Sequence, residues 1–295
     1  MQKIYLFIWC LFTAGAHAAD GFSPKLTLDP SLQERWVTNH PEPFSLFTVP
    51  KSGSHLIIKL IYFLTGYFPE WHMHYPIREV ERTYLYTHLC LSPALQNSYA
   101  MYLPHRKKIV HIRDLRDVAV SIVHHILKTK EWPGLGEPHK WAAFKNASFD
   151  EQLLYVIEHD YEAVNETMVQ FSLGRIAQQA VDYLDDPEVL VTRYESLVGP
   201  AGGGSLEMQV SELERIMIHL GGSIDAAFAS LIANLLYGDG TDPFEGLGFR
   251  TYHSTFREGK IGQWRDVFKP EHKAAFKKRM GAALVALGYA ADDEW

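Results

Sequence analysis

The feature that most constrains this chain is an apolar run that leads through a short polar loop into a second apolar segment. The run covers residues 44–49, the loop is Pro50-Lys-Ser-Gly-Ser54, and the second segment extends from Leu56 to Leu64. This order predicts a strand, a tight turn and a helix, whose backbone N–H groups converge on one point and can hold a phosphate-like anion. Lys51 precedes the glycine, whereas the lysine of the common nucleotide-binding loop follows its glycines, so the loop is of a different kind.

Two more apolar runs, Lys108–Ile112 and Glu188–Thr192, read as buried strands, and long helical patterns separate them. Strands that alternate with helices predict an α/β fold: three layers, P-loop-like, with a central, mainly parallel sheet flanked by helices. The carboxyl ends of parallel strands share one edge, which is where ligands bind. We therefore expect Lys51, Arg113 and Tyr194, which follow the three strands, to lie along one edge.

The rest of the chain is read more coarsely. Residues 67–82 look irregular and rich in aromatic side chains, and residues 199–204 look like a flexible loop. Helices are expected at residues 93–103 and within residues 205–237, and residues 149–184 should form two helices with a break near Gly174. A last, amphipathic helix should begin at Pro270, with Phe276, Met280, Leu284 and Leu287 on one face.

The N-terminus reads as a secretory signal peptide. A short basic start precedes an apolar stretch over residues 4–16, and Ala16-His-Ala18 fits a cleavage pattern. We expect residues 1–18 to be a signal peptide, 19–43 an N-terminal segment and 44–295 a single domain. This predicts a periplasmic or lumenal protein of the secretory pathway, attached to a membrane only if the signal is not cleaved. Without the signal, the protein would be cytoplasmic.

Charge and cysteine content exclude several classes. The net charge of −7 argues against a nucleic-acid partner. The two cysteines are Cys10 and Cys90, and loss of the signal would leave no intrachain disulfide. His72-Met-His74 and His124-His125 have no carboxylate or cysteine at metal-ligand spacing, so no metal site is expected. The sequence specifies no oligomeric state.

Four segments in one order resemble the sulfotransferase family that uses 3′-phosphoadenosine 5′-phosphosulfate (PAPS), in its soluble, cytosolic-type branch. They are Pro50-Lys-Ser-Gly-Ser54, Tyr86-Thr-His-Leu89, Ile109-Val-His-Ile-Arg-Asp-Leu-Arg-Asp-Val-Ala-Val-Ser121 and Phe256-Arg-Glu-Gly-Lys-Ile-Gly-Gln-Trp-Arg265. The resemblance extends from about Phe44 to Met280. It implies a metal-free, in-line transfer of a sulfuryl group from PAPS to a hydroxyl, or an amine, on a small molecule, lipid or glycan.

The resemblance also implies roles for individual residues. His88 would be the general base, and Lys51 would stabilise the charge that develops on the leaving phosphate. PAPS would be held at its two anionic ends and its adenine. The implied contacts are Lys51, Ser52, Gly53, Ser54 and His55 for the 5′ end, Arg113, Ser121, Arg257 and Gly259 for the 3′-phosphate, and Tyr194 near the adenine.

The chain departs from the family pattern at three positions. Tyr86 stands where the family often has a lysine two residues before the base, and Leu56 stands where it often has a tryptophan that stacks on adenine. Glu258 replaces the usual basic residue after Arg257. The irregular segments 67–86 and 132–141 are expected to line the acceptor pocket.

Two rival functions remain open at this level. One is a P-loop-type nucleotide phosphotransferase, which would require ATP and magnesium, and the missing G-x-x-x-x-G-K-[ST] motif argues against it. The other is a non-catalytic protein that binds PAPS, its product or another nucleotide on the same fold. Ordinary structural roles also remain: His88 as a core histidine, and Arg113 as an ion-pair partner of Asp114 or Asp117.

Overall fold

The computed structural model describes residues 41–71, 83–89, 107–130, 135, 137–160, 172–236 and 257–295. The expected signal peptide, the helix at 93–103 and the glycine-rich stretch after residue 237 lie outside the described residues, as do residues 19–40.

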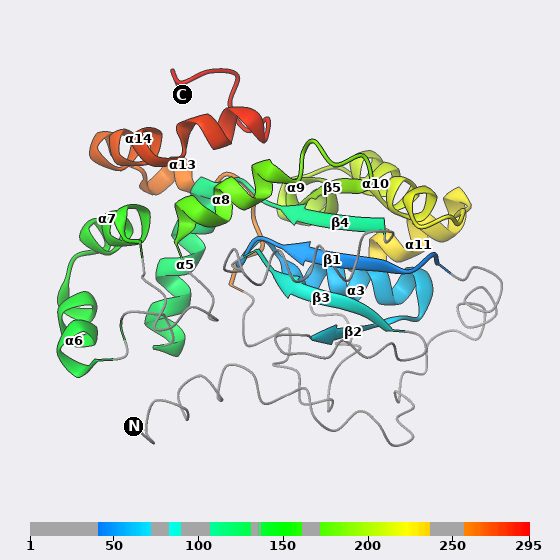
Figure 1. Ribbon diagram of the computed structural model, residues 1–295, viewed down its shortest axis with the longest axis horizontal. Coiled ribbons are helices and arrows are strands. Elements are labelled where there is room, and N and C mark those ends of the chain that lie inside the picture. The colour runs from blue at the N-terminus through cyan, green and yellow to red at the C-terminus, as the bar shows by residue number, and fades with distance from the viewer. Residues whose placement is uncertain are drawn as a thin grey trace.

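The described strands form one sheet whose neighbours all run parallel (Figure 1). In the order β2-β3-β1-β4-β5, the strands are β2 (Phe68–Trp71), β3 (Thr83–His88), β1 (Phe44–Thr48), β4 (Lys107–Ile112) and β5 (Val189–Arg193). The parallel sheet of an α/β fold is therefore confirmed, and the three strands expected from apolar runs lie next to one another at its centre and one edge.

The expectation that residues 67–82 are irregular is wrong for the described part. Residues 68–71 pair with β3 as the edge strand β2. Pro69 lies inside this strand, where it cannot donate to a ladder, and edge strands tolerate proline because one side of them needs no partner. Pairing with β3 therefore decides the structure of a segment whose own propensity for a strand is weak.

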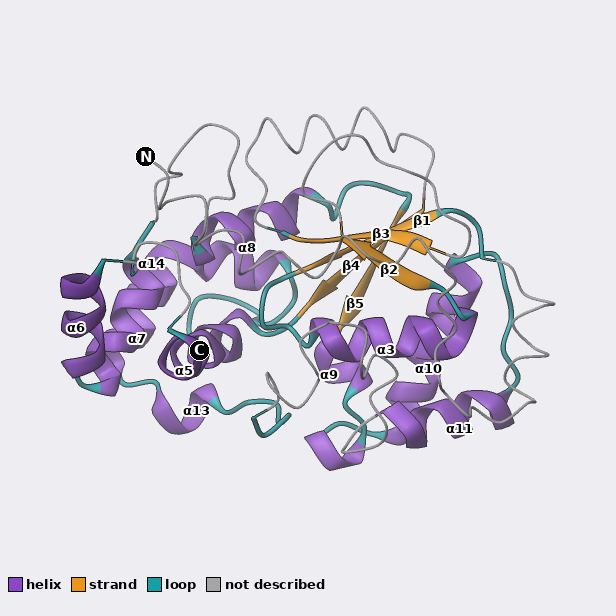
Figure 2. Ribbon diagram, turned by 90° about the horizontal axis from the view of Figure 1, so that it is seen from below, coloured by secondary structure: helices purple, strands orange, loops and turns teal. Residues whose placement is uncertain are grey.

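Helices cover both faces of the sheet. They are α3 (Ser54–Thr65), α5 (Leu115–Thr129), α6 (Pro138–Asn146), α7 (Phe149–Glu158), α8 (Leu173–Asp182), α9 (Tyr194–Leu197), α10 (Leu206–His219), α11 (Ala226–Leu236), α13 (Trp264–Val267) and α14 (Pro270–Ala286). In Figure 2, α3, α9, α10 and α11 gather on one side of the sheet, and α5, α7, α8 and α14 form a second group at the left of the view. Among the described residues, no helix is long and apolar enough to span a bilayer.

The strands bury alternate residues in two separate cores. On β1, Phe44 and Leu46 pack against α3, α10 and α11, whereas Phe47 packs with the helices α5, α7, α8 and α14. Successive side chains of a strand point to opposite faces, so a strand buried on both sides reads as a continuous apolar run. This is why the central strands were visible in the sequence. The expected apolar face of α14 is also confirmed, because Phe276, Met280 and Leu284 are buried in the second of these cores.

The two helices expected within residues 149–184 are present: α7 ends at Glu158, and α8 begins at Leu173, next to Gly174. The Ser172 hydroxyl accepts a hydrogen bond from the Arg175 N–H in the first turn of α8. One loop expectation changes. Residues 199–204 are not a loose loop. They contain a 3-10 turn, Pro200–Gly202, closed by backbone hydrogen bonds to Gly199 and Pro200, and Gly202 is buried.

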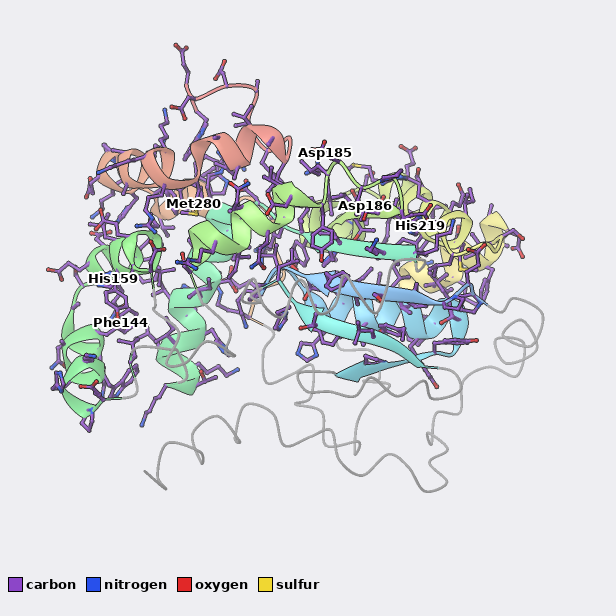
Figure 3. The ribbon with its side chains drawn as sticks, in the orientation of Figure 1. Phe144, His159, Asp185, Asp186, His219 and Met280 are labelled. Carbon is purple, nitrogen blue, oxygen red and sulfur yellow. The ribbon has the colours of Figure 1, made fainter. Side chains whose placement is uncertain are left out.

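The amino end of β4 is held by two contacts at Lys108. The Lys108 ammonium lies 2.8 Å from the Asp186 carboxylate, and His219 Nε2 lies 3.0 Å from the Lys108 carbonyl oxygen. Figure 3 labels Asp186 and His219, which contact the side chain and the carbonyl oxygen of Lys108 respectively. At the other end of the strands, Thr48 pairs in register with both His88 and His111, and His111 pairs with Thr192. The carboxyl ends therefore meet at one edge, as expected.

Candidate active site at the carboxyl edge of the sheet

The anion loop adopts the tight turn that its sequence predicts. Lys51 and Gly53 both have left-handed backbone angles, with φ of 66° and 90°, and the Ser52 N–H bonds the Val49 carbonyl oxygen at 3.1 Å. Helix α3 then begins at Ser54. A left-handed lysine costs roughly 1–2 kcal/mol, and such strain is concentrated at functional sites. The turn points the start of α3 toward the edge where the strands end.

Beneath this loop, Thr48 joins the loop to His88. The Thr48 hydroxyl lies 2.9 Å from the Ser54 hydroxyl, 2.7 Å from His88 Nδ1 and 3.5 Å from the Tyr86 hydroxyl. The structure thus places His88 on the strand next to the anion loop, linked to it through one buried side chain. Tyr86, in the position of the family's lysine, belongs to the same cluster of side chains.

The pKa of His88 is lowered to about 3. Burial is the largest cause, the nearby side chains of His55 and Lys51 lower the pKa further, and a hydrogen bond to the backbone of Thr48 opposes the shift. His88 is therefore neutral near pH 7, which is the state in which an imidazole can accept a proton. His55, in the first turn of α3, is half-buried and near enough to influence His88.

His111 supports the other half of the loop. Its Nε2 lies 3.0 Å from the Ser52 carbonyl oxygen, and its Nδ1 lies 2.9 Å from the Thr192 hydroxyl. The ring is fully buried, and burial lowers the pKa of His111 to about 3. A neutral ring that faces a carbonyl oxygen must carry its hydrogen on Nε2, so Nδ1 accepts a hydrogen bond from Thr192.

Arg113 and Tyr194 form a stacked pair next to the loop. The Arg113 guanidinium lies 4.4 Å from the centre of the Tyr194 ring, and its Nη2 donates to the Lys260 carbonyl oxygen at 2.8 Å. The Tyr194 hydroxyl donates to the Gly259 carbonyl oxygen at 2.7 Å. The same ring packs against Gly53 so closely that a Cβ atom there would lie 2.5 Å from it. Tyr194 therefore connects the anion loop with the segment that begins at Arg257.

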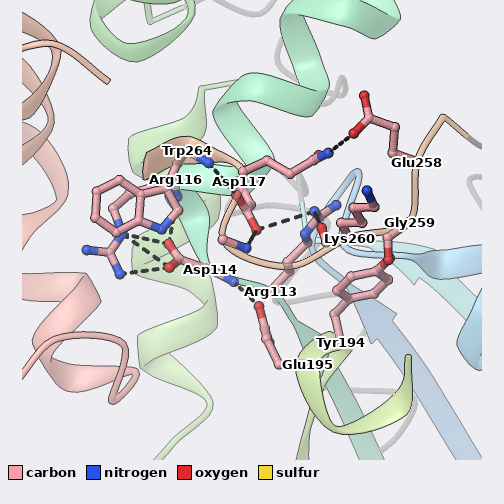
Figure 4. A network of polar contacts seen from close by, with 12 residues as sticks. Arg113, Asp114, Arg116, Asp117, Tyr194, Glu195, Glu258, Gly259, Lys260 and Trp264 are labelled. Carbon is pink, nitrogen blue, oxygen red and sulfur yellow. Dashed lines mark hydrogen bonds and ion pairs between the residues drawn. The ribbon is translucent and has the colours of Figure 1, made fainter. Parts of the chain in front are cut away.

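Asp117 fixes this last segment from α5 (Figure 4). Its carboxylate accepts hydrogen bonds from the Gly262 N–H at 2.7 Å and the Trp264 N–H at 2.9 Å, and it lies 3.4 Å from Arg113 Nη2. The side chain has no exposed surface. One buried carboxylate thus holds Arg113 and the 257–264 segment in a common position. Of the two expected partners of Arg113, Asp117 is the one that pairs with it.

Asp114 pairs with a different arginine. Its carboxylate forms an ion pair with Arg116 at 2.7 Å and caps α5 by accepting the Arg116 N–H at 3.0 Å. The Arg116 guanidinium also covers the Trp264 ring at 3.9 Å and the Trp295 ring at 4.5 Å. Trp264 is buried there, which anchors the end of the segment that carries Arg257.

Arg257 and Ser121 are less tightly placed. Arg257 has 33% of its side chain exposed and donates to Glu258 Oε1 at 3.2 Å and to Gln263 Oε1 at 2.5 Å. In Figure 4, Glu258 points away from Arg113. Ser121 is half-buried on α5, and within the described ranges no hydrogen bond joins it to Arg113 or Arg257. The structure therefore brings Lys51, Ser52, Gly53, Ser54, His55, His88, Arg113, Tyr194 and Gly259 together, and leaves Arg257 and Ser121 at the margin.

Three residues of the site were not singled out as functional by sequence reasoning: Thr48, His111 and Asp117. Thr48 and His111 are the last or next-to-last residues of buried strands that lead into the site. A polar residue in that position was the available signal. Within the part of the chain that the structure describes, no group of three His, Cys, Asp or Glu side chains is placed to bind a metal ion.

Comparison with known proteins agrees with this geometry. Residues 41–288 match a family model described as Sulfotransferase domain. Mouse sulfotransferase SULT7A1 complexed with PAP (3′-phosphoadenosine 5′-phosphate) is a structural neighbour with a TM-score of 0.58 and 18% identity, and the match covers 89% of this chain and 94% of that one. By sequence, no protein with a curated description matches the chain.

Two structures of retinol dehydratase are also similar. One, in complex with androsterone and inactive cofactor PAP, has a TM-score of 0.51 and 16% identity, with 85% of each chain covered. The other, in a complex with retinol and PAP, has a TM-score of 0.53 and 16% identity, with 87% of this chain and 86% of that one covered. These likenesses bear on the fold, whereas the family match covers most of the sequence. The chain therefore belongs to the sulfotransferase domain family.

Proposed function

We propose that this protein transfers a sulfuryl group from PAPS to a hydroxyl group, with His88 as general base and without a metal ion. The observation that carries the proposal is the register of β1 against β3. It places the loop that starts at Lys51 and the imidazole of His88 at neighbouring strand ends, joined through Thr48. An anion loop and a neutral histidine at one edge are the two parts that in-line transfer from an anionic donor needs.

The described residues fit PAPS at both of its anionic ends. Lys51 and the loop serines supply a cation and donors for the 5′ end. Arg113, about nine-tenths buried, keeps a buried Nε with no hydrogen-bond partner among the described residues, which suits a site for the 3′-phosphate. Gly53 lets the Tyr194 ring lie directly against the loop, because a Cβ there would be 2.5 Å from the ring. PAPS, when bound, supplies a sulfuryl group on a good leaving phosphate.

Each residue then has a defined task. Lys51 stabilises the charge that grows on the 5′-phosphate as its bond to sulfur breaks and the acceptor oxygen bonds to sulfur. His88 takes the proton of the acceptor hydroxyl at Nε2. Tyr194 and Arg113 hold the nucleotide portion, and Asp117 keeps them in place. Arg257, which is exposed in this structure, would turn toward the 3′-phosphate.

The acceptor is proposed to be the hydroxyl of a small molecule, with an amine, a lipid or a glycan as less favoured classes. Androsterone and retinol, which accompany PAP in the retinol dehydratase structures, are both small apolar alcohols. Much of the expected lining, 67–86 and 132–141, lies outside the described residues. Exchanging these two segments for those of another family member should change acceptor preference, and an unchanged preference would refute their role.

A turnover assay with labelled PAPS and a panel of alcohols tests the proposal. Wild type should form a labelled product without added metal, and His88→Ala should lose on the order of 10²–10⁴-fold in kcat. Unchanged turnover by His88→Ala would eliminate His88 as the base. Turnover that requires ATP and magnesium would instead indicate a phosphotransferase.

A second function, binding of PAPS or PAP without turnover, is favoured by one observation. The pKa of His88 is lowered to about 3, well below the range in which a general base is most effective. For the enzyme, by contrast, an anion bound near Lys51 would offset the charge of the lysine and raise the pKa of His88. Binding of PAP without any turnover of PAPS would support this second function.

Export by residues 1–18 is also a proposal. N-terminal sequencing of the mature protein and fractionation of the host cells test it, and we expect the mature chain to begin at Ala19. A chain that retains Met1 in the cytoplasm would refute it.

A further inference from the structure

A row of four polar side chains crosses the sheet beneath the anion loop. In register, it runs from His88 on β3 through Thr48 on β1 and His111 on β4 to Thr192 on β5. Except for half-buried His88, these residues are fully buried. The row forms two histidine–threonine pairs, and each pair is joined to one serine of the loop. The position of each hydrogen in such a row matters, because a buried donor or acceptor that lacks its partner cannot turn to water instead.

The pair at His111 has one possible arrangement. Because Nε2 faces the Ser52 carbonyl oxygen, it carries the hydrogen, and Thr192 donates to Nδ1. His111 is therefore a fixed structural histidine, and its tautomer is an internal reference for the other pair.

The pair at His88 has two arrangements. The Thr48 hydroxyl has one hydrogen but lies within hydrogen-bond distance of both Ser54 and His88 Nδ1. In the first arrangement, His88 Nδ1–H donates to Thr48, and Thr48 donates to Ser54. In the second, Thr48 donates to Nδ1, and the hydrogen of His88 sits on Nε2. Only the first leaves a lone pair on Nε2, so only the first allows His88 to accept a proton there.

We propose that the chain Ser54–Thr48–His88 couples anion binding in the loop to the tautomer of His88. An anion at the loop takes the hydrogen of Ser54, so that Ser54 presents only lone pairs to Thr48. Thr48 must then donate to Ser54 and accept from His88 Nδ1–H. Thr48 is thus a positioning residue. When an anion occupies the loop, His88 carries its hydrogen on Nδ1 and can accept a proton at Nε2. This coupling rests on the proposed function, because it assumes that the loop binds the phosphate end of PAPS.

The geometry explains why Thr48 suits this task. Its hydroxyl is buried, so bulk water does not compete for the hydrogen bonds that it makes. Tyr86, at 3.5 Å, is a distant competitor for its hydrogen compared with Ser54 at 2.9 Å. His88 itself is held neutral by burial, so its single ring hydrogen has to be on one nitrogen or the other.

Nitrogen-15 NMR of the histidine side chains tests the coupling, with PAP as an unreactive probe and calorimetry to establish that it is bound. The signal that disappears in His88→Asn identifies His88, and His111 marks the Nε2–H form. With saturating PAP, wild type should show His88 as Nδ1–H. In Ser54→Ala and Thr48→Val, PAP-bound His88 should be Nε2–H, whereas Thr48→Ser should keep the wild-type tautomer.

Turnover gives a second readout. Thr48→Val should lower kcat by on the order of 10²-fold while the Kd of PAP stays within about threefold, and Thr48→Ser should restore kcat. Thr87→Val is the matched control. Thr87, on β3, is as buried as Thr48, but its side chain points to the face of the sheet opposite the side chain of His88. PAP-bound wild type with His88 as Nε2–H would overturn the coupling and leave the proposed function standing. Failure to bind PAP at all would overturn the proposed function and the coupling with it.

Discussion

Replacing Asp117 with asparagine should loosen the part of the site that holds the nucleotide. The carboxylate serves two backbone N–H groups and Arg113 at once, without exposed surface. An asparagine of the same size keeps one acceptor oxygen, but its NH₂ group would face either an N–H or the guanidinium. The variant therefore loses at least one charge-assisted hydrogen bond, worth about 1.5–3 kcal/mol, and leaves the charge of Arg113 less well compensated.

Breaking a buried ion pair by removing one partner costs about 3–5 kcal/mol, and we expect the loss of unfolding free energy in this range. Urea denaturation measures it. Since Arg113 and the 257–264 segment lose their common support, the Kd of PAP, measured by calorimetry, should rise at least about tenfold, equivalent to roughly 1.4 kcal/mol.

Asp186→Asn is the matched control, because its ion pair with Lys108 is partly exposed and should contribute about 1 kcal/mol or less. A variant Asp117→Asn with the urea midpoint and PAP affinity of wild type would refute the role assigned to this carboxylate.

The remaining predictions concern the loop and its supports. The pKa of buried His111 is about 3, below the value of about 6.5 in the unfolded chain, so unfolding takes up a proton between these values and stability falls as pH decreases through them. The unfolding free energy should fall by roughly 1.4 kcal/mol per pH unit at most. Urea titrations at pH 7 and pH 5 should show a smaller fall for His111→Gln than for wild type, and an equal fall would contradict the role of His111. Gly53→Ala should destabilise the protein by about 1–3 kcal/mol and weaken PAP binding, because its φ is 90° and the new Cβ would collide with Tyr194. Gly174→Ala, whose Cβ meets nothing closer than 3.7 Å, should be neutral or stabilising by calorimetric melting, and similar melting of the two variants would be inconsistent with strain at Gly53. Tyr194→Phe should cost about 1 kcal/mol, because it removes the hydrogen bond to Gly259 but keeps the ring, and an unchanged urea midpoint would contradict this.

Much of the fold could be read from local patterns. The strands β1, β4 and β5 are apolar runs next to turn residues, and the apolar face of α14 follows a helical spacing; burial on both sides of a strand makes such runs visible. The edge strand β2 could not be read in this way. In its sequence Phe-Pro-Glu-Trp, the proline and glutamate obscure the strand preference of the two aromatic residues, and β2 forms because β3 supplies hydrogen-bond partners.

The contacts that organise the site were harder to foresee. Asp117 bonds the N–H of Gly262, 145 residues further along the chain, and nothing local to either residue predicts the pair. Thr48 and His88 are 40 residues apart and meet because two parallel strands adopt one register out of several. A shift by a single residue would send one of the two side chains to the other face of the sheet.

By itself, the sequence determined the kind of protein. The order of apolar runs and helical patterns specifies a parallel α/β sheet, and Lys51 ahead of its glycine, with three further motifs, points to the sulfotransferase family. These signals are local, because each depends on a few neighbouring residues and the backbone that they favour.

Only the tertiary structure decided which side chains act on one another. Strand register places Thr48 between the anion loop and His88, burial keeps His88 and His111 neutral, and one carboxylate ties Arg113 to a distant segment. These relations depend on distances between segments far apart in the chain and on the exclusion of water from the sheet's edge. The physical reason is that hydrogen bonding and charge compensation are set by packing, which a linear pattern of residues does not contain.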